Sequence, residues 1–379
     1  MEIRSWAVEL DDLAAEQARR TSELPILAGP LALMPDAHGG YGCTVGSVIA
    51  TEGAIIPAAV GVDIGCGMAA VETNVRADQL PALEGYLKHL HRIVPAGVGQ
   101  GHTRDPDGMS AVALSGLGLP TGSAVTPGQE KKLARQFGSL GSGNHFIEVC
   151  LDERDMVWVL LHSGSRGIGN ELAMVHIKLA KALELGLEDP DLNYFLQGTP
   201  EFDAYIADML WGQDYARESR AVMLRACTAA FFRHVGTGEV VRTVNCHHNY
   251  AALEAHGDRT LWITRKGAIR AGTGELGLIP GSMGTRSYVT RGLGNPMSYE
   301  SSSHGAGRRM SRTRARKELT LESFKERMAG RTWQERDAKA LLDEHPDAYK
   351  DIDAVMEAQK DLVAVEHELH AVLNYKGAK

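Results

Sequence analysis

The stretch VWVLLHSGSRGIGNELAMVHIKLAKALELG, residues 157–186, contains the three kinds of segment from which we expect the fold to be built. VWVLL is a short run of β-branched, aromatic and aliphatic residues, which is typical of a buried strand. HSGSRGIG is a glycine-rich turn, and the apolar residues from Asn170 onward recur at helical spacing until Gly186. The stretch therefore predicts a strand, a loop that exposes polar groups, and a helix over 170–186.

The same combination of a short apolar run and a glycine-rich turn recurs along the chain. The other predicted strands are SVIA (47–50), AIIPAAVGV (54–62) and LWITR (261–265). Most of the glycine clusters lie in 38–67, 96–128, 138–143, 163–169, 267–294 and 305–307. Loops held by rigid strands commonly carry functional groups, so we expect the site at these turns.

Helical patterns occupy much of the second half. A long one covers 202–235, with an expected break near Gly212, and residues 349–373 predict a last amphipathic helix. Thr332 and Glu335 form a candidate capping box before an Ala/Leu-rich helix. Residues 96–128, rich in Gly, Pro, Thr and Ser, predict a long surface loop. We find no repeat or linker, and predict one large α+β domain over 1–379, its site in a central cleft formed by glycine-rich strand-end loops.

Composition and charge limit the possible functions. Of the 379 residues, 44% are hydrophobic and 23% charged, as in ordinary globular proteins. There is no apolar run of about 18 residues, and the start, MEIRSWAVELDDLAAEQ, lacks the regions of a signal peptide, so we expect a cytoplasmic protein. A net charge of −8 argues against a nonspecific DNA-coating protein.

One local run is strongly basic. It comprises Arg308, Arg309, Arg312, Arg314, Arg316 and Lys317, and Arg286 and Arg291 precede it. Two interpretations stay open: a local phosphate-binding patch, or the solvated face of a helix.

Four stretches combine metal-ligating side chains with glycine. They are GVDIGCGM (Asp63, Cys66), GSLGSGNHFIEV (Asn144, His145, Glu148), LLHSGSRGIGN (His162, Arg166) and VNCHHNY (His247, His248, Asn249). A single histidine beside a strand is more often structural, but four such loops can converge on one site. A carboxylate, a thiolate and three imidazoles suffice for one or two divalent metals, among which zinc, manganese and iron stay open.

Other residue patterns suggest phosphate chemistry. IPGSMGTRS, residues 279–287, offers a turn whose backbone N–H groups could bind an anion, although an ordinary glycine-rich hairpin explains it equally well. Arg166 and Arg308 supply forked donors suited to phosphate oxygens. The chain has no HExxH helix and no GxxxxGK[ST] loop, which disfavours a zincin protease and a P-loop nucleotidase.

Nine motifs together resemble the RtcB-type RNA ligases, in their shorter bacterial form. They are MPDAHGGYG, GVDIGCG, GSGNHFIEV, LHSGSRGIGN, CHHN, RKGA, IPGSMG, HGAGRRMSR and the terminal YKG, in this order from about Met34 to Lys376. The sequence departs from the family pattern in lacking a proline after GGY and in carrying Ser303 where a cysteine is frequent. Residues 96–128 are also shorter than the helical insertion of relatives, which leaves the RNA-end preference open.

The resemblance implies an enzyme that joins an RNA 3′-phosphate or 2′,3′-cyclic phosphate end to a 5′-hydroxyl end, using GTP and two manganese ions. It implies one metal at Asp63, Cys66 and His145 and a second at Cys66, His162 and His248, with His247 as an alternative to His248. The histidine of HGAGR, His304, becomes the guanylylated nucleophile, and Arg166 and Arg308 hold phosphates. The implied nucleotide-binding residues are Asn144, His145, Phe146, Ile147, Glu148, His248, Asn249, Pro280, Gly281, Ser282, Met283, Ser287, His304, Gly305, Ala306, Gly307 and Lys376.

The implied chemistry suits histidine, because a neutral imidazole can attack the α-phosphate of GTP at neutral pH. Two other functions stay open: a metal-dependent 2′,3′-cyclic phosphodiesterase without ligation, and a noncatalytic RNA-end binder. The sequence leaves undecided the natural RNA, whether from repair or tRNA splicing, and the need for an archease-like activator.

Overall fold

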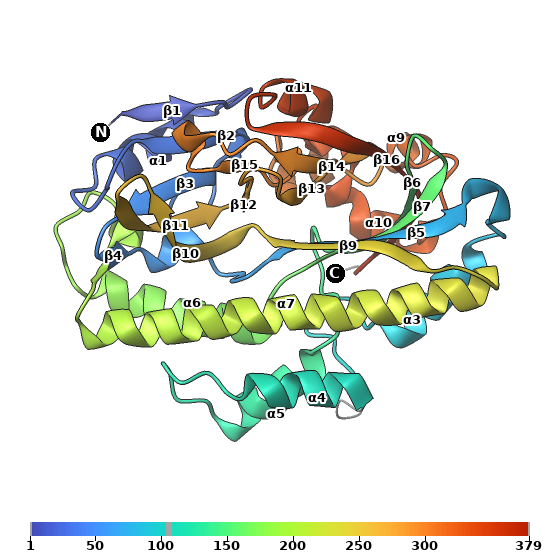
Figure 1. Cartoon of the computed structure of the whole chain (residues 1–379), viewed down its shortest axis with the longest axis horizontal. Coiled ribbons are helices and arrows are strands. Elements are labelled where there is room, and N and C mark those ends of the chain that lie inside the picture. Colours follow the sequence, from blue (N-terminus) through green and yellow to red (C-terminus); the bar gives the residue numbers. More distant parts are fainter. Residues whose placement is uncertain (1, 104–107, 378–379) are drawn as a thin grey trace.

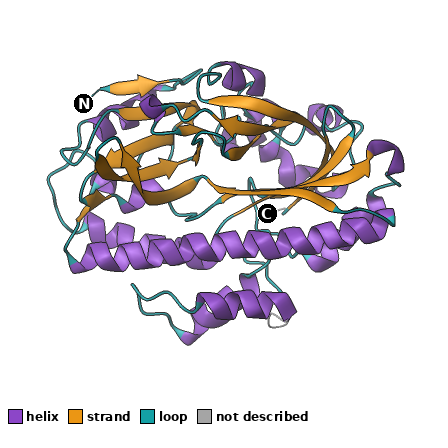
Figure 2. Cartoon of the chain, viewed as in Figure 1, coloured by secondary structure: helices purple, strands orange, loops and turns teal. Residues whose placement is uncertain are grey.

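The computed structural model describes residues 2–103 and 108–377, which form two main β-sheets with helices outside them (Figures 1 and 2). The five-stranded sheet has the order β1 (Ile3–Ser5), β2 (Leu31–His38), β3 (Val45–Thr51), β11 (Arg259–Lys266) and β10 (Asn249–His256). The seven-stranded sheet has the order β13 (Leu276–Pro280), β14 (Arg286–Gly292), β16 (Val363–Lys376), β6 (Phe146–Leu151), β7 (Met156–Ser163), β5 (Gly67–Arg76) and β9 (Val240–His247). Two small ribbons pair β4 (Ala54–Ile55) with β8 (Phe195–Leu196) and β12 (Ala268–Arg270) with β15 (Ser301–Ser303).

The two edge strands of the seven-stranded sheet, β9 and β13, contact each other, which shows that the sheet is strongly curved. Its concave side holds a core that includes Met68, Trp158 and Leu278, and its other side packs on helices α3 (Glu84–Ile93) and α7 (Pro200–Val235). The mixed α/β architecture predicted from the sequence is confirmed. Within the described residues, no helix is both long and apolar enough to cross a bilayer.

Helix α7 is the longest element and runs beneath both sheets, with α4 (Gly108–Leu117) and α5 (Pro127–Gln136) on its far side (Figure 1). The Thr199 side chain caps its N-terminus by accepting from Phe202 N, and Gly236 ends it in a left-handed conformation. The expected break near Gly212 is wrong. Gly212 is buried inside the helix, where a Cβ would lie 3.1 Å from Ile64 Cγ2, so the glycine allows close packing instead.

The remaining α-helices are between 4 and 16 residues long. Helix α6 (Arg166–Lys181) confirms the helix predicted from Asn170, although it begins and ends earlier, and β3, β7 and β11 confirm three predicted strands. The other helices are α1 (Asp12–Ser22), α2 (Pro57–Val60), α8 (Arg312–Glu318), α9 (Leu321–Arg327), α10 (Ala338–Leu341) and α11 (Ile352–Glu357).

The predicted last helix, 349–373, is wrong. Only α11 is helical there, and Val363–Lys376 forms the central strand β16, paired with β14 and β6. Along it His367, Leu369, Ala371 and Leu373 are buried, which is a two-residue period. Pairing on both sides outweighs the helix propensity of its Ala, Leu and Glu residues.

Three other local predictions also need correction. Residues 54–62 are not one strand, because Pro57 starts helix α2 after the two-residue β4. Thr332 does not cap a helix, since its N–H donates to Val372 O in β16 and α10 begins only at Ala338. The predicted surface loop at 96–128 contains helix α4, which packs on α7; residues 104–107 of that prediction lie outside the described residues.

Strand register determines where the polar loops meet. In the order β6–β7–β5–β9, all neighbours are antiparallel, so the starts of β6 and β5 and the ends of β7 and β9 share one edge. His162 pairs with Phe146 on one side and with Met68 on the other, and Gly67 pairs with His247. The residues next to these positions are therefore brought together.

Candidate active site

The four ligand-bearing stretches converge at that shared sheet edge. Cys66 directly precedes β5, His145 directly precedes β6, His162 is the penultimate residue of β7, and His248 directly follows β9. All four side chains are buried. The His248 N–H donates to Cys66 O at 2.8 Å, which fixes the β9–β10 turn against the Cys66 loop.

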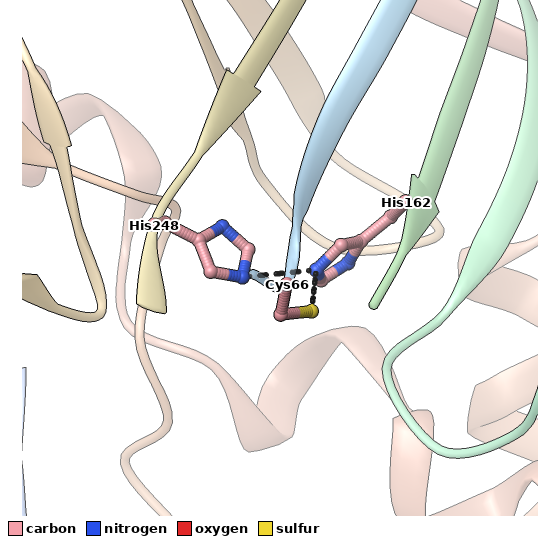
Figure 3. A group of neighbouring side chains, drawn as sticks. All are labelled: Cys66, His162 and His248. Atoms are coloured by element: carbon pink, nitrogen blue, oxygen red, sulfur yellow. Dashed lines mark hydrogen bonds between the residues drawn. The ribbon is translucent and has the colours of Figure 1, made fainter. Parts of the chain in front are cut away.

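The side chains form two donor groups that share one sulfur atom. In the first, Cys66 Sγ lies 3.3 Å from His162 Nε2, which lies 3.3 Å from His248 Nε2 (Figure 3). In the second, His145 Nε2 lies 3.3 Å from the same Sγ and 3.1 Å from Asp63 Oδ2. Neighbouring ligands bound to one ion at ~2.0–2.3 Å lie about this far apart.

The hydrogen bonds of the outer ring nitrogens show that these groups suit cations. Nδ1 of His145 is 2.9 Å from Leu140 O, and Nδ1 of His162 is 3.1 Å from Asn144 O, so each Nδ1 carries the proton. The Nε2 lone pair of His145 then faces the Asp63 carboxylate and the Cys66 sulfur. A cation placed among these electron donors would be held by all of them, and the donor types fit a divalent metal.

Electrostatics within the protein point the same way. Burial lowers the pKa of His162 and His248 well below the usual value and keeps both imidazoles neutral, as ligands must be. Burial raises the pKa of the Cys66 thiol in the metal-free chain, and a bound cation would reverse that effect.

His304 follows β15 and lies beside the first donor group, that of Cys66, His162 and His248. Its ring centroid is 4.7 Å from that of His248, and its Nδ1 is 2.6 Å from Oδ2 of the fully buried Asp36. A lone pair at that distance from a carboxylate oxygen would be repelled, so Nδ1 carries a proton. In the neutral ring the Nε2 lone pair is then free to attack an electrophile.

A cavity extends from His304. Its lining includes most of the residues predicted to bind a nucleotide: Asn144, Phe146, Glu148, Pro280, Gly281, Ser282, Met283, Ser287, His304, Gly305, Ala306, Gly307 and Lys376. His38, His162, Arg308, Arg312 and Tyr349 complete the wall. Metal-ligand candidates, the candidate nucleophile and the cavity therefore form one continuous site.

Comparison with known proteins agrees with this geometry. The family model described as "tRNA-splicing ligase RtcB" matches residues 17–377. The chain belongs to the RtcB family. It is 42% identical to the "RNA-splicing ligase RtcB" of Escherichia coli (strain K12), over 99% of this chain and 97% of that protein. It is 32% identical to the protein of that name from Mycobacterium tuberculosis (90% and 95%) and 31% identical to the "tRNA-splicing ligase RtcB" of Pyrobaculum aerophilum (92% and 87%).

Three of the residues expected from the RtcB resemblance lie neither in the cavity wall nor in a donor group. The Ile147 side chain points to the opposite face of β6 from Phe146 and Glu148, into the core beneath the sheet, and does not line the cavity. The Asn249 side chain accepts from Gly267 N at 2.9 Å and does not line the cavity. His247 is hydrogen-bonded to Gly65 O at 2.9 Å, whereas His248 joins the donor group.

The two predicted phosphate-binding arginines lie in different parts of the site. Arg166 has a left-handed backbone (φ 60°) at the start of α6, and its guanidinium lies so close to Gly141 that a Cβ there would be 2.2 Å from Nη1. It lies at the Asp63–His145 group rather than in the cavity. Arg308 lines the cavity, stacks on the Tyr349 ring and donates to Asp343 O at 2.7 Å.

The basic run is not an open patch of positive charge. Arg312 forms ion pairs with Asp343 and Glu344, and Arg316 lies 2.6 Å from Asp343. Arg314 pairs with Glu318, and Arg286 and Arg291 also have carboxylate partners. Most of these arginines therefore hold the fold together, which favours neither of the two simple interpretations of the run.

Sequence reasoning missed two buried carboxylates. Asp36, in MPDAHGG, contacts His304 from a strand far away in the sequence. Glu344 lies 2.9 Å from Lys376 Nζ and accepts from Tyr349 Oη at 2.6 Å, and the charge of Lys376 helps to hold its pKa at about 2 against the effect of burial. The MPDAHGG motif could have identified Asp36, whereas no motif in the sequence pointed to Glu344.

Proposed function

We propose that this protein is an RNA ligase that joins RNA 3′-phosphate or 2′,3′-cyclic phosphate ends to 5′-hydroxyl ends through a guanylylated His304. The observation that carries the proposal is the contact of His304 Nδ1 with Asp36 at 2.6 Å, in the wall of the cavity and beside His248. The names of the RtcB relatives support the same reaction. We further propose that it acts in the cytoplasm, in RNA repair or tRNA splicing.

The first step is a phosphoryl-group transfer to His304. Nε2 attacks the α-phosphorus of GTP, an N–P bond forms, and the P–O bond to the β-phosphate breaks as pyrophosphate leaves. Asp36 holds the ring in the required tautomer and stabilises the positive charge that develops on it. The glycines after His304 let a phosphate approach closely, because no Cβ covers the backbone.

Two manganese ions are the proposed metals, held by Asp63, Cys66 and His145 and by Cys66, His162 and His248. Bound divalent ions supply neutralisation of phosphate charge at the reacting centre. Arg166 is placed to contact a phosphate near the Asp63–His145 group, and Arg308 to contact one in the cavity.

The later steps move GMP. The RNA 3′-phosphate, after hydrolysis of a cyclic end, attacks the phosphorus on His304, so the N–P bond breaks and an RNA-(3′)pp(5′)G end forms. The 5′-hydroxyl of the second RNA then attacks the 3′-phosphate, and GMP leaves. Phe146, Glu148, Ser282 and Lys376 are the proposed contacts of the guanine nucleotide. An archease-like activator stays a prediction.

Intact-protein mass after incubation with GTP and manganese tests the proposal. The wild type should gain one acid-labile GMP, and His304→Ala should gain none. His370→Ala, which removes an exposed histidine outside the cavity, should behave as the wild type. Opening of a cyclic phosphate end without an adduct and without GTP would show a phosphodiesterase instead.

A further inference from the structure

A second groove lies beside the candidate active site. It runs between Tyr41, in the turn from β2 to β3, and helix α6, and its walls include Asn170, Met174, Lys178 and Lys181. Its volume is about 590 Å³, within the range of ligand-binding clefts. None of its lining residues belongs to the nucleotide cavity or the donor groups.

Both walls of the groove begin at the active site. On one side, Asn170 follows Arg166 by one turn of α6, a rise of ~6 Å. On the other, Lys266 Nζ donates to Tyr41 O, and the next residue, Gly267, is so close to the nucleophile that a Cβ would lie 3.1 Å from His304 Cε1. A nucleic-acid strand that leaves the site past Arg166 would therefore enter this groove.

The groove presents apolar faces flanked by cations. Tyr41 and Met174 are each 44% exposed, and Lys181 Nζ lies 5.4 Å from the centre of the Tyr41 ring. Lys178 is exposed and, among the described residues, has no carboxylate partner. Exposed aromatic faces next to lysines bind single-stranded nucleic acid, because bases stack on the ring and phosphates contact the cations.

Neither Glu171, in the groove wall, nor Asp191, which contacts the groove residue Lys181, cancels this charge. Glu171 is held by Lys132 and accepts from Gln129 Nε2 at 3.0 Å, and Asp191 is paired with Lys181. The positive charge of Lys178 is therefore not neutralised by either carboxylate. This differs from the basic run after His304, most of whose arginines already have carboxylate partners.

We infer that this groove binds the single-stranded segment of an RNA substrate next to its reacting end, with a base stacked on Tyr41 and the backbone beside Lys178. The inference rests on the proposed RNA ligase function. It gives the chain a site for RNA that is separate from the site for GTP.

The test measures RNA binding and guanylylation separately. The probe is a fluorescent 12-nucleotide single-stranded RNA with a 3′-phosphate, titrated against full-length protein without GTP. Tyr41→Ala should raise the Kd about tenfold or more, as expected for one lost stacked base, and Tyr41→Phe should restore most of the affinity. Lys178→Gln should weaken binding and lower the slope of log K against log salt by ~0.7, whereas Lys88→Gln, an exposed lysine on α3, should not.

Formation of the GMP adduct should be unchanged in the Tyr41 and Lys178 variants, since neither residue lines the nucleotide cavity. Failure of the wild type to form the adduct would refute the proposed function without affecting the RNA titration. An unchanged RNA Kd in Tyr41→Ala would overturn the inference. A change of sedimentation coefficient in that variant, without loss of RNA affinity, would instead show that the groove contacts a second copy of the chain.

Discussion

Replacing Asp36 by Asn is the sharpest test of how the fold prepares His304. The substitution keeps the size of a side chain that is fully buried and removes only its charge. The carboxylate has two contacts with His304: Oδ2 is 2.6 Å from Nδ1 and accepts from the backbone N–H at 3.3 Å. We expect guanylylation to slow at least about 100-fold while GTP binding changes little.

The magnitude follows from these contacts. Losing one charge-assisted contact costs about 1.5–3 kcal/mol, or roughly 10- to 150-fold in rate. The other carboxylate oxygen, Oδ1, is buried without a hydrogen-bond partner, so an amide NH₂ placed there would be unsatisfied. If the amide is rotated by 180°, its NH₂ group faces Nδ1 of His304 and donates to it. Nδ1 must then accept, so the ring proton moves to Nε2, the proposed nucleophilic atom. The same tautomer change in a serine protease costs ~10⁴-fold.

The assay is single-turnover formation of the GMP adduct, followed by intact mass at saturating GTP and manganese. A matched control is Asp208→Asn, which neutralises another fully buried aspartate 2.8 Å from a histidine, His176, outside the cavity. The control should lower the free energy of unfolding without slowing adduct formation. A rate for Asp36→Asn within threefold of the wild type would refute the role given to Asp36.

Three further predictions concern the metals, the cavity and the loop that follows His304. Cys66→Ala removes the sulfur common to both donor groups, so calorimetric titration should show manganese binding weakened by more than the ~10- to 100-fold cost of losing an outer-shell partner. Burial raises the pKa of Glu148 to about 7, so the folded chain binds the extra proton and stability should fall by up to ~3 kcal/mol as pH rises from ~4.5 to 7. Urea unfolding of Glu148→Gln should lack this fall. Gly307→Ala would put a Cβ 2.3 Å from Asp36 O at a positive φ, so it should cost about 1–2 kcal/mol in unfolding free energy and slow adduct formation.

The ligand-bearing loops could be predicted because each carries its own local signal. A run such as VWVLL indicates a strand, and glycine with His162 and Arg166 after it indicates a functional turn. The structure brings Asp63, Cys66, His145, His162 and His248 together in the two groups expected from the family resemblance. Their roles as manganese ligands stay a prediction.

Local patterns failed where partners far away in the sequence decide the structure. Residues 363–376 resemble a helix in composition, yet β14 and β6 leave a gap in the sheet that only a strand can fill. The family resemblance implied Ile147 together with its neighbours, and the two-residue period of β6 places its side chain on the opposite face. Asp36 could not be assigned to His304 from spacing, since Asp36 lies on β2 and His304 follows β15, a strand of a different sheet.

The arrangement of the sheets explains how one site can serve two substrates. The edge formed by β6, β7, β5 and β9 gathers the donor groups, and the β12–β15 ribbon carries His304 to that edge from the side. The nucleotide cavity then lies toward β13, β14 and the end of β16, whereas α6 leads away with the Tyr41 groove. Under the proposed function, GTP would reach His304 through the cavity and RNA through the groove, so a nucleophile that accepts GMP from one substrate and gives it to the other would be open to both.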